Sequence, residues 1–181
     1  MSDNKPKIHA MLRRPIDCSL QNIELFIKIV LASGEVPVEN LNRGVPAAEM
    51  LIFVMQEKVV IGVCALRYPN AKFHKHLFEK ATVPEMYNPH SLEACWASIL
   101  PNYRNQGALS SIYKTTQKYT EHRPMHGVHR AENNLISEPI KKLGYVQAGI
   151  DFYSDTSDNK LCLIVKNHDP VFDPNKKMRY S

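Results

Sequence analysis

The sequence has few of the features that mark membrane-spanning or secreted proteins. None of its 181 residues belong to an apolar run of the ~18 residues that a membrane-spanning helix needs. The charged start of the chain, residues 1–6, is followed by no apolar stretch, so the sequence shows no signal peptide. We therefore expect a soluble protein of the cytoplasm that does not use a membrane as a partner.

Cysteine is scarce, and no two cysteines form a CxxC pair. Three of the four lie inside apolar, strand-like runs, which predicts small buried side chains that stay reduced. The four cysteines are Cys18, Cys64, Cys95 and Cys162.

Two pairs of histidines, His74 with His76 and His126 with His129, have the close spacing seen in some metal sites. Neither pair has a cysteine or a carboxylate nearby at the spacing of a zinc site. We therefore predict no metal centre.

The net charge of +5 is concentrated in three segments, residues 1–14, 66–80 and 166–181. Basic segments of this kind can bind a phosphate-bearing ligand or a nucleic acid. Solvated chain ends and one solvated loop produce the same pattern, and we prefer that interpretation.

Hydrophobic periodicity and turn residues predict a mixed α/β fold without an internal linker. A single domain is expected over residues 1–166, followed by a polar tail over residues 167–181. Strands are predicted at 8–13, 49–56, 58–68, 92–100, 145–153 and 161–166, with a short strand near 128, and helices at 19–34, 108–122 and 133–143. The strand at 92–100, the helix at 108–122 and the strand near 128 form one crossover connection.

The most informative stretch joins the strand at 92–100 to the helix at 108–122. The start of a helix presents unpaired N–H groups and a partial positive charge, which suit a pyrophosphate. Gly107 leaves room for a phosphate to approach, and Arg104 adds a cation. Alone, this motif is also typical of a tight turn with a surface arginine.

Residues 101–107 resemble the acyl-CoA loop of the GCN5-related N-acetyltransferase (GNAT) superfamily, whose pattern is Gln/Arg-x-x-Gly-x-Gly/Ala. Residues 133–145 resemble the family's second motif, in which an asparagine opens a helix and Lys-x-Gly-Phe/Tyr closes it. The resemblance is best between residues 92 and 153. It implies a mixed, mostly antiparallel central sheet flanked by helices, with a strand, a phosphate loop and a helix forming the crossover.

The resemblance also implies a binding site for acetyl-CoA or another acyl-CoA. The backbone of the strand edge would pair with the pantetheine arm, the loop would hold the pyrophosphate, and an asparagine would face the pantetheine. Ile99 and Leu100 form the strand edge, and the asparagine is Asn133. The loop residues are Arg104, Asn105, Gln106, Gly107, Ala108 and Leu109.

The sequence departs from the family pattern at two positions. Leu109 replaces the third small residue of the phosphate loop, although it also fits the core face of the helix. Ile140 stands where family members often have a tyrosine that returns a proton to the CoA thiolate. The resemblance therefore supports CoA binding more strongly than the usual proton path.

Glu93 is the candidate general base, since some family members place a glutamate at a similar distance before the phosphate loop. Alternation along the strand would put Glu93 on one face with Cys95, Ala97 and Ile99. A carboxylate at the end of a strand that faces water is an equal alternative, and His90 is the nearest substitute base.

With Ile140 unable to donate a proton, the thiolate would take one from water, Tyr145 or Tyr153, or leave as the anion.

The resemblance implies an N-acetyltransferase that moves an acetyl or short acyl group from CoA to a primary amine of a small molecule or a protein by direct attack. Two alternatives remain: a related protein that modifies nucleic acid, and a CoA-binding module without catalysis. The sequence leaves the acceptor open, and monomer and homodimer are equally compatible with it.

Overall fold

The computed structural model of the protein describes residues 7–132 and 140–168. Its contacts group into two compact units. Among the described residues, the first unit comprises residues 7–68 and 92–121, and the second comprises residues 69–91, 122–132 and 140–168. Within the described part of the chain, no helix has the length and apolarity needed to cross a membrane.

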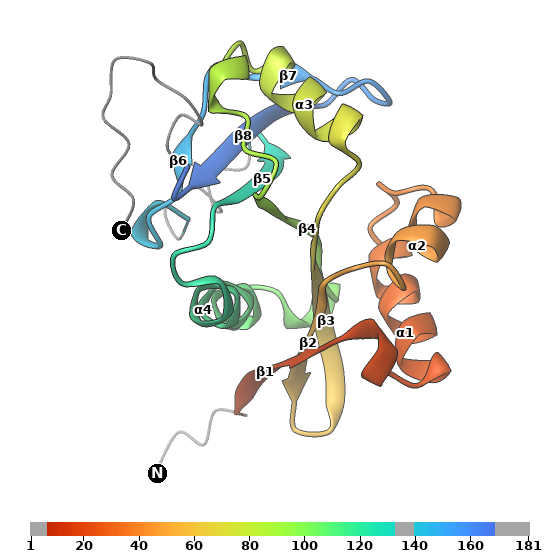
Figure 1. Cartoon of the computed structure of the whole chain (residues 1–181). Coiled ribbons are helices and arrows are strands. Elements are labelled where there is room, and N and C mark those ends of the chain that lie inside the picture. Colours follow the sequence, from red (N-terminus) through yellow and green to blue (C-terminus); the bar gives the residue numbers. More distant parts are fainter. Residues whose placement is uncertain (1–6, 133–139, 169–181) are drawn as a thin grey trace. The chain divides into compact units, whose positions relative to one another are not determined.

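The sheet of the first unit is an antiparallel meander in which each strand pairs with the next along the chain (Figure 1). The strands predicted at 49–56 and 58–68 are confirmed as β2 and β3, which pair antiparallel. The four strands are β1 (Ile8–Arg13), β2 (Met50–Gln56), β3 (Val59–Arg67) and β4 (Leu92–Ile99).

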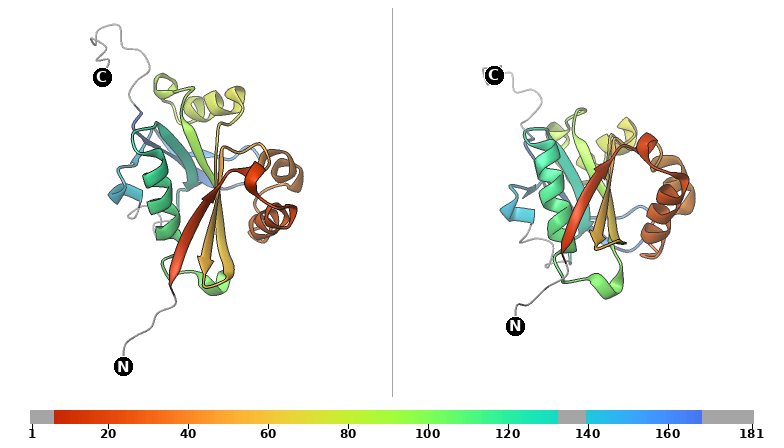
Figure 2. Two further views of the ribbon diagram at one scale, coloured as in Figure 1. Left: turned by 60° about the horizontal axis from the view of Figure 1, so that its bottom comes forward. Right: turned by 90° about the horizontal axis from the view of Figure 1, so that it is seen from below.

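Helices cover both faces of this sheet: α4 lies on one side of β1–β3, and α1 and α2 lie on the other (Figure 2). The N-cap of α1 is Ser19, whose hydroxyl accepts a hydrogen bond from the Asn22 N–H. The elements are α1 (Leu20–Leu31), α2 (Val38–Gly44), α4 (Ala108–Thr120) and two short 3-10 turns, η1 (Pro15–Asp17) and η3 (Pro101–Tyr103).

A β-bulge in β4 overturns the predicted alternation along that strand. Cys95 pairs with Ala65 and Ser98 with Val63, so two residues of β4 lie opposite Cys64. Paired residues share a face, and the extra residue therefore reverses the alternation. Glu93 and Cys95 lie on one face of β4, whereas Ile99 lies on the other.

In the second unit, β8 pairs antiparallel with three strands. The elements are α3 (Ala71–Lys80), η2 (Pro84–Met86), β5 (Met125–Arg130), β6 (Val146–Gln147), β7 (Phe152–Tyr153) and β8 (Lys160–Lys166). The strand predicted at 145–153 is two short strands, because Gly149 interrupts it. Gly149 has a φ of +68° and lies against the Ala81 carbonyl, which leaves no room for a Cβ and accepts the Ile150 N–H.

The buried residues of α3 are His74, Leu77 and Phe78, whereas Phe73 is exposed. Of the helix predicted at 133–143, only the end from residue 140 lies within the described residues.

Candidate active site

The strand, loop and helix predicted to bind phosphate are adjacent in the first unit. The Leu100 N–H still donates to the Ile61 carbonyl (2.9 Å), so the edge of the sheet extends one residue beyond β4. The chain then makes the η3 turn and enters α4 at Gly107, the N-cap, with a φ of +94°. Asn105 is also left-handed, with a φ of +60°. Gly107 therefore has the conformation that the turn requires and that glycine adopts most easily.

The start of α4 is accessible to a ligand. The first bond of the helix joins the Ser111 N–H to the Gly107 carbonyl (3.0 Å), and the N–H groups of the first turn before it have no acceptor within the helix. A Cβ built on Gly107 would meet no atom within 4 Å. The loop thus combines open space with backbone donors, the arrangement that anions favour.

Two side chains of the loop fold back onto its backbone. Arg104 Nε donates to the Ile99 carbonyl (3.2 Å), and Gln106 Nε2 donates to the Asn102 carbonyl (2.9 Å). Both side chains are exposed. The Arg104 cation consequently lies at the end of β4, next to the backbone that the sequence assigned to the pantetheine arm.

The first two residues of α4 have different environments. Ala108 is buried, and Leu109 is half-buried at the margin of the core face. The centre of the buried face runs through Ala108, Ile112, Thr116 and Thr120. The sequence had placed Leu109 on that face, so the buried face is rotated about the helix axis by about one residue relative to the prediction.

Glu93 is buried, with 5% of its surface exposed, and its Oε2 accepts a hydrogen bond from Arg67 Nε at 2.7 Å. The alternative of a carboxylate that faces water is therefore wrong. The role of general base stays a prediction, as does that of His90, which is exposed.

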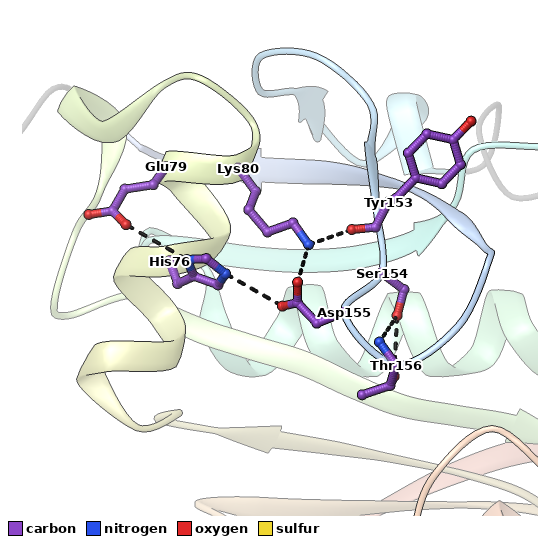
Figure 3. A network of polar contacts seen from close by, with 7 residues as sticks. All are labelled: His76, Glu79, Lys80, Tyr153, Ser154, Asp155 and Thr156. Carbon is purple, nitrogen blue, oxygen red and sulfur yellow. Dashed lines mark hydrogen bonds and ion pairs between the residues drawn. The ribbon is translucent and has the colours of Figure 1, made fainter.

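The two candidate acids belong to the second unit and differ in exposure. Tyr145 is 7% exposed, and Lys166 Nζ lies 5.8 Å from the centre of its ring. Tyr153 is 65% exposed, and its hydroxyl points away from the Lys80 side chain, which donates to the Tyr153 carbonyl (Figure 3). Asn133 lies outside the described residues, and its predicted role stays a prediction.

Ion pairs use two of the four cations of the basic segment 66–80. Arg67 pairs with Glu93, and Lys80 pairs with Asp155 at 2.6 Å, where His76 also contacts the same carboxylate (Figure 3). Neutralised cations attract phosphate less strongly. The charge available for a nucleic acid on this segment is therefore smaller than the composition suggests.

No group of three or more potential metal ligands occurs among residues 7–132 and 140–168. His74 and His126, which the sequence placed in separate pairs, stack on each other with ring centres 4.1 Å apart.

The structure also contains a cluster that the sequence did not reveal. Ser91 and His126 are fully buried, and a chain of hydrogen bonds links them to His168 and Met86. His168 Nδ1 donates to the Met86 carbonyl (2.9 Å), so its Nε2 accepts the Ser91 hydroxyl (2.6 Å). His74 completes the cluster. Its members are far apart in the sequence, and no spacing rule would have found them.

Burial raises the pKa values of the cysteine thiols. Desolvation raises the pKa of Cys64 to about 12 and that of Cys162 to about 11, and it raises the pKa of Cys95 well above the ordinary value. All four cysteines are free, and Cys18 and Cys95 are half-buried.

In a native-state titration with a thiol reagent near pH 8, we expect at most one fast-reacting group, Cys18. Burial raises the pKa of Cys18 as well, but its side chain is half-buried and the charge of the nearby Arg13 opposes the shift. Reductant should leave the melting temperature unchanged. Two or more fast-reacting thiols would contradict this assignment.

A groove of about 770 Å³ in the first unit lies between β1, the start of α1 and the β2–β3 hairpin. Met11, Leu25, Phe53 and Met55 are among its lining residues. None of the predicted site residues lines this groove, so the candidate phosphate site is not part of it.

Comparison with solved structures identifies the fold. The chain resembles an acyl-CoA N-acyltransferase from Pseudomonas aeruginosa (TM-score 0.62, 9% identity, 88% of this chain and 99% of that one). It also resembles FeeM, an N-acyl amino acid synthase from uncultured soil microbes (TM-score 0.65, 13% identity, 89% and 91%). A ribosomal-protein-alanine N-acetyltransferase from Brucella melitensis is similar as well (TM-score 0.58, 14% identity, 86% and 98%).

No protein-family model matches the chain, and no curated protein matches it in sequence.

The chain therefore has the GNAT fold of N-acyltransferases, an α/β fold with a mostly antiparallel sheet flanked by helices. This confirms the fold class that the loop and helix motifs predicted. Identities this low establish the fold and not the reaction.

Proposed function

We propose that the protein is an acyl-CoA-dependent N-acyltransferase that moves an acetyl or short acyl group to a primary amine of a small molecule or a protein. The observation that carries the proposal is the open, left-handed Gly107 at the start of α4, directly after β4, in a fold shared with N-acyltransferases. An acyl-CoA supplies the acyl group as an activated thioester.

The residues present fit the pyrophosphate of CoA. The first-turn N–H groups of α4 donate to phosphate oxygens, Gly107 leaves space for them, and Arg104 supplies a positive charge. The backbone edge at Ile99 and Leu100 is assigned to the pantetheine arm. Leu109 is half-buried, so it crowds the loop less than its size suggests.

The bulge in β4 supports a role for a strand amide in the reaction. A bulge leaves one residue out of the hydrogen-bonded ladder, and in β4 this residue is either Trp96 or Ala97. An N–H fixed in this way can stabilise the oxyanion that forms when an amine attacks a thioester carbonyl.

Glu93 is the proposed general base, because an alkylammonium group must lose a proton before it attacks. Arg67 binds one of its carboxylate oxygens and leaves Oε1 as the proton acceptor. Tyr145 or Tyr153 is proposed to return a proton to the thiolate.

Glu93→Gln is expected to lower kcat/KM at neutral pH by about 100-fold, and the rate should recover as rising pH deprotonates the amine itself. Glutamine has a similar shape and still accepts the Arg67 hydrogen bond, but it cannot take the proton. The measurement is kcat/KM against pH for both proteins. An unchanged profile and rate would assign the proton transfer to His90 or to solvent.

The proposal is tested by identifying ligands that copurify with the protein by mass spectrometry, followed by turnover of a small panel of acyl-CoAs with a panel of amines. Release of CoA that depends on the amine supports the proposal. Acyl-CoA binding without turnover on any amine would indicate a non-catalytic module. DNA binding that weakens steeply with salt, without amine acylation, would favour a nucleic-acid acceptor.

A further inference from the structure

Trp96 has a backbone conformation that bulky residues rarely adopt. Its φ is +56°, and it lies in the β4 bulge opposite Cys64. Glycine usually fills the left-handed position of such a bulge. A strained conformation persists only where the surroundings hold it, and such positions cluster at functional sites.

Arg67 holds the indole from one side. Its guanidinium carbon lies 4.6 Å from the centre of the Trp96 ring, while its Nε donates to Glu93 Oε2 at 2.7 Å. The Arg67 side chain is 24% exposed. A planar guanidinium can stack on an aromatic ring and bind a carboxylate at the same time, which lysine cannot do.

Gly44, the last residue of α2, borders the indole on another side. A Cβ on Gly44 would lie 2.5 Å from Trp96 Cη2, so helix and ring are too close for a methyl group. Gly44 does not have a positive φ. The contact with Trp96, and not the backbone conformation, therefore requires glycine here.

We propose that Arg67, Glu93 and Gly44 clamp Trp96, and that Arg67 is thereby a positioning residue that fixes the β4 bulge for acyl transfer. Three elements, β3, α2 and β4, meet at one strained residue a short distance before the phosphate loop. A loosened bulge would misdirect the amide proposed to stabilise the oxyanion and would leave the CoA loop intact. This inference rests on the proposed function, since it assigns a role within that reaction.

Two variants on different elements test the clamp. Arg67→Lys keeps a cation beside Glu93 but removes the planar group over the indole, and Gly44→Ala adds a methyl group that displaces the Cη2 edge of the indole. Both are expected to lower kcat by about 10-fold while KM for acetyl-CoA stays within about two-fold of the parent. Glu39→Ala, an exposed change in α2, is the matched control and should change neither constant.

Trp96 is the only tryptophan in the chain, so its fluorescence reports on the clamp without any turnover. Arg67→Lys and Gly44→Ala are expected to shift the emission and increase quenching by acrylamide, and Glu39→Ala is not. Parent-like fluorescence in both variants would overturn the clamp, and an unchanged kcat or a kcat loss matched by a rise in KM would overturn the positioning role. A parent without turnover would instead refute the proposed function, while the fluorescence would still decide the clamp.

Discussion

Gly107→Glu is expected to raise the Kd for acetyl-CoA by about 100-fold or more, as measured by calorimetry. The new side chain would place a carboxylate in the open space before the N–H groups of α4, where the pyrophosphate is proposed to bind. It would also strain a backbone with a φ of +94°. Arg104→Ala should have a smaller effect, about 1–3 kcal/mol, because it removes one charge-assisted contact.

Gly34→Glu is the matched control for this change. Gly34 is also left-handed, with a φ of +72°, and a Cβ there would likewise meet no atom within 4 Å. The control therefore adds the same charge and comparable backbone strain to the same unit, away from the start of α4. Equal losses of affinity in the two variants would mean that Gly107 is not at the binding site.

Acidification is expected to lower the free energy of unfolding as the pH falls from about 6.5 to about 4. Burial, helped by the nearby His168, lowers the pKa of His74 from 6.5 to about 4. Burial also lowers the pKa of His168. Between pH 6.5 and pH 4, the unfolded chain therefore binds protons that the folded chain does not. The contribution of these histidines to the free energy of unfolding is complete above pH 6.5 and is lost as the pH falls toward 4. His74 alone accounts for about 2–3 kcal/mol.

The measurement is urea unfolding of the full chain at pH 7 and pH 4.5. His74→Phe keeps a ring against His126 but cannot be protonated, and it should reduce the loss of stability between the two pH values by about 2–3 kcal/mol. His122→Phe changes an exposed histidine of the same unit and serves as the control. If His74→Phe and the parent lose the same stability, the buried cluster does not cause the acid sensitivity.

The elements that the sequence predicted well are those whose local signals agree with one another. β1 occupies residues Ile8–Arg13 as predicted, and α1 begins after its Ser19 cap. The start of α4 also lies where Gly107 indicated. In each case, a turn or capping residue and the spacing of the apolar residues indicate the same boundary. No contact with a distant residue is needed to predict that boundary.

Distant contacts explain the errors. Trp96, in the β4 bulge, contacts Arg67 and lies against Gly44, and both residues belong to other elements. The rule of strict alternation along a strand could not predict the bulge. Gly149 divides a predicted strand because it approaches the Ala81 carbonyl. The sequence reveals neither contact, since each is a property of tertiary packing.

The sequence could predict only the part of the candidate site that lies in one continuous segment. The candidate phosphate loop is continuous in sequence, so its residues could be named directly. The partner of Glu93 is Arg67, 26 positions earlier, and only the pairing of β3 with β4 brings the two together. The buried group of Ser91, His126 and His168 likewise depends on the folding of the second unit.

A crystal structure of the protein grown with acetyl-CoA tests the central claim most directly. The account predicts that the pyrophosphate oxygens accept hydrogen bonds from the backbone N–H groups between Asn105 and Leu109, with the Arg104 side chain turned from the Ile99 carbonyl toward a phosphate. A CoA molecule bound elsewhere, with the start of α4 in contact only with solvent, would contradict it.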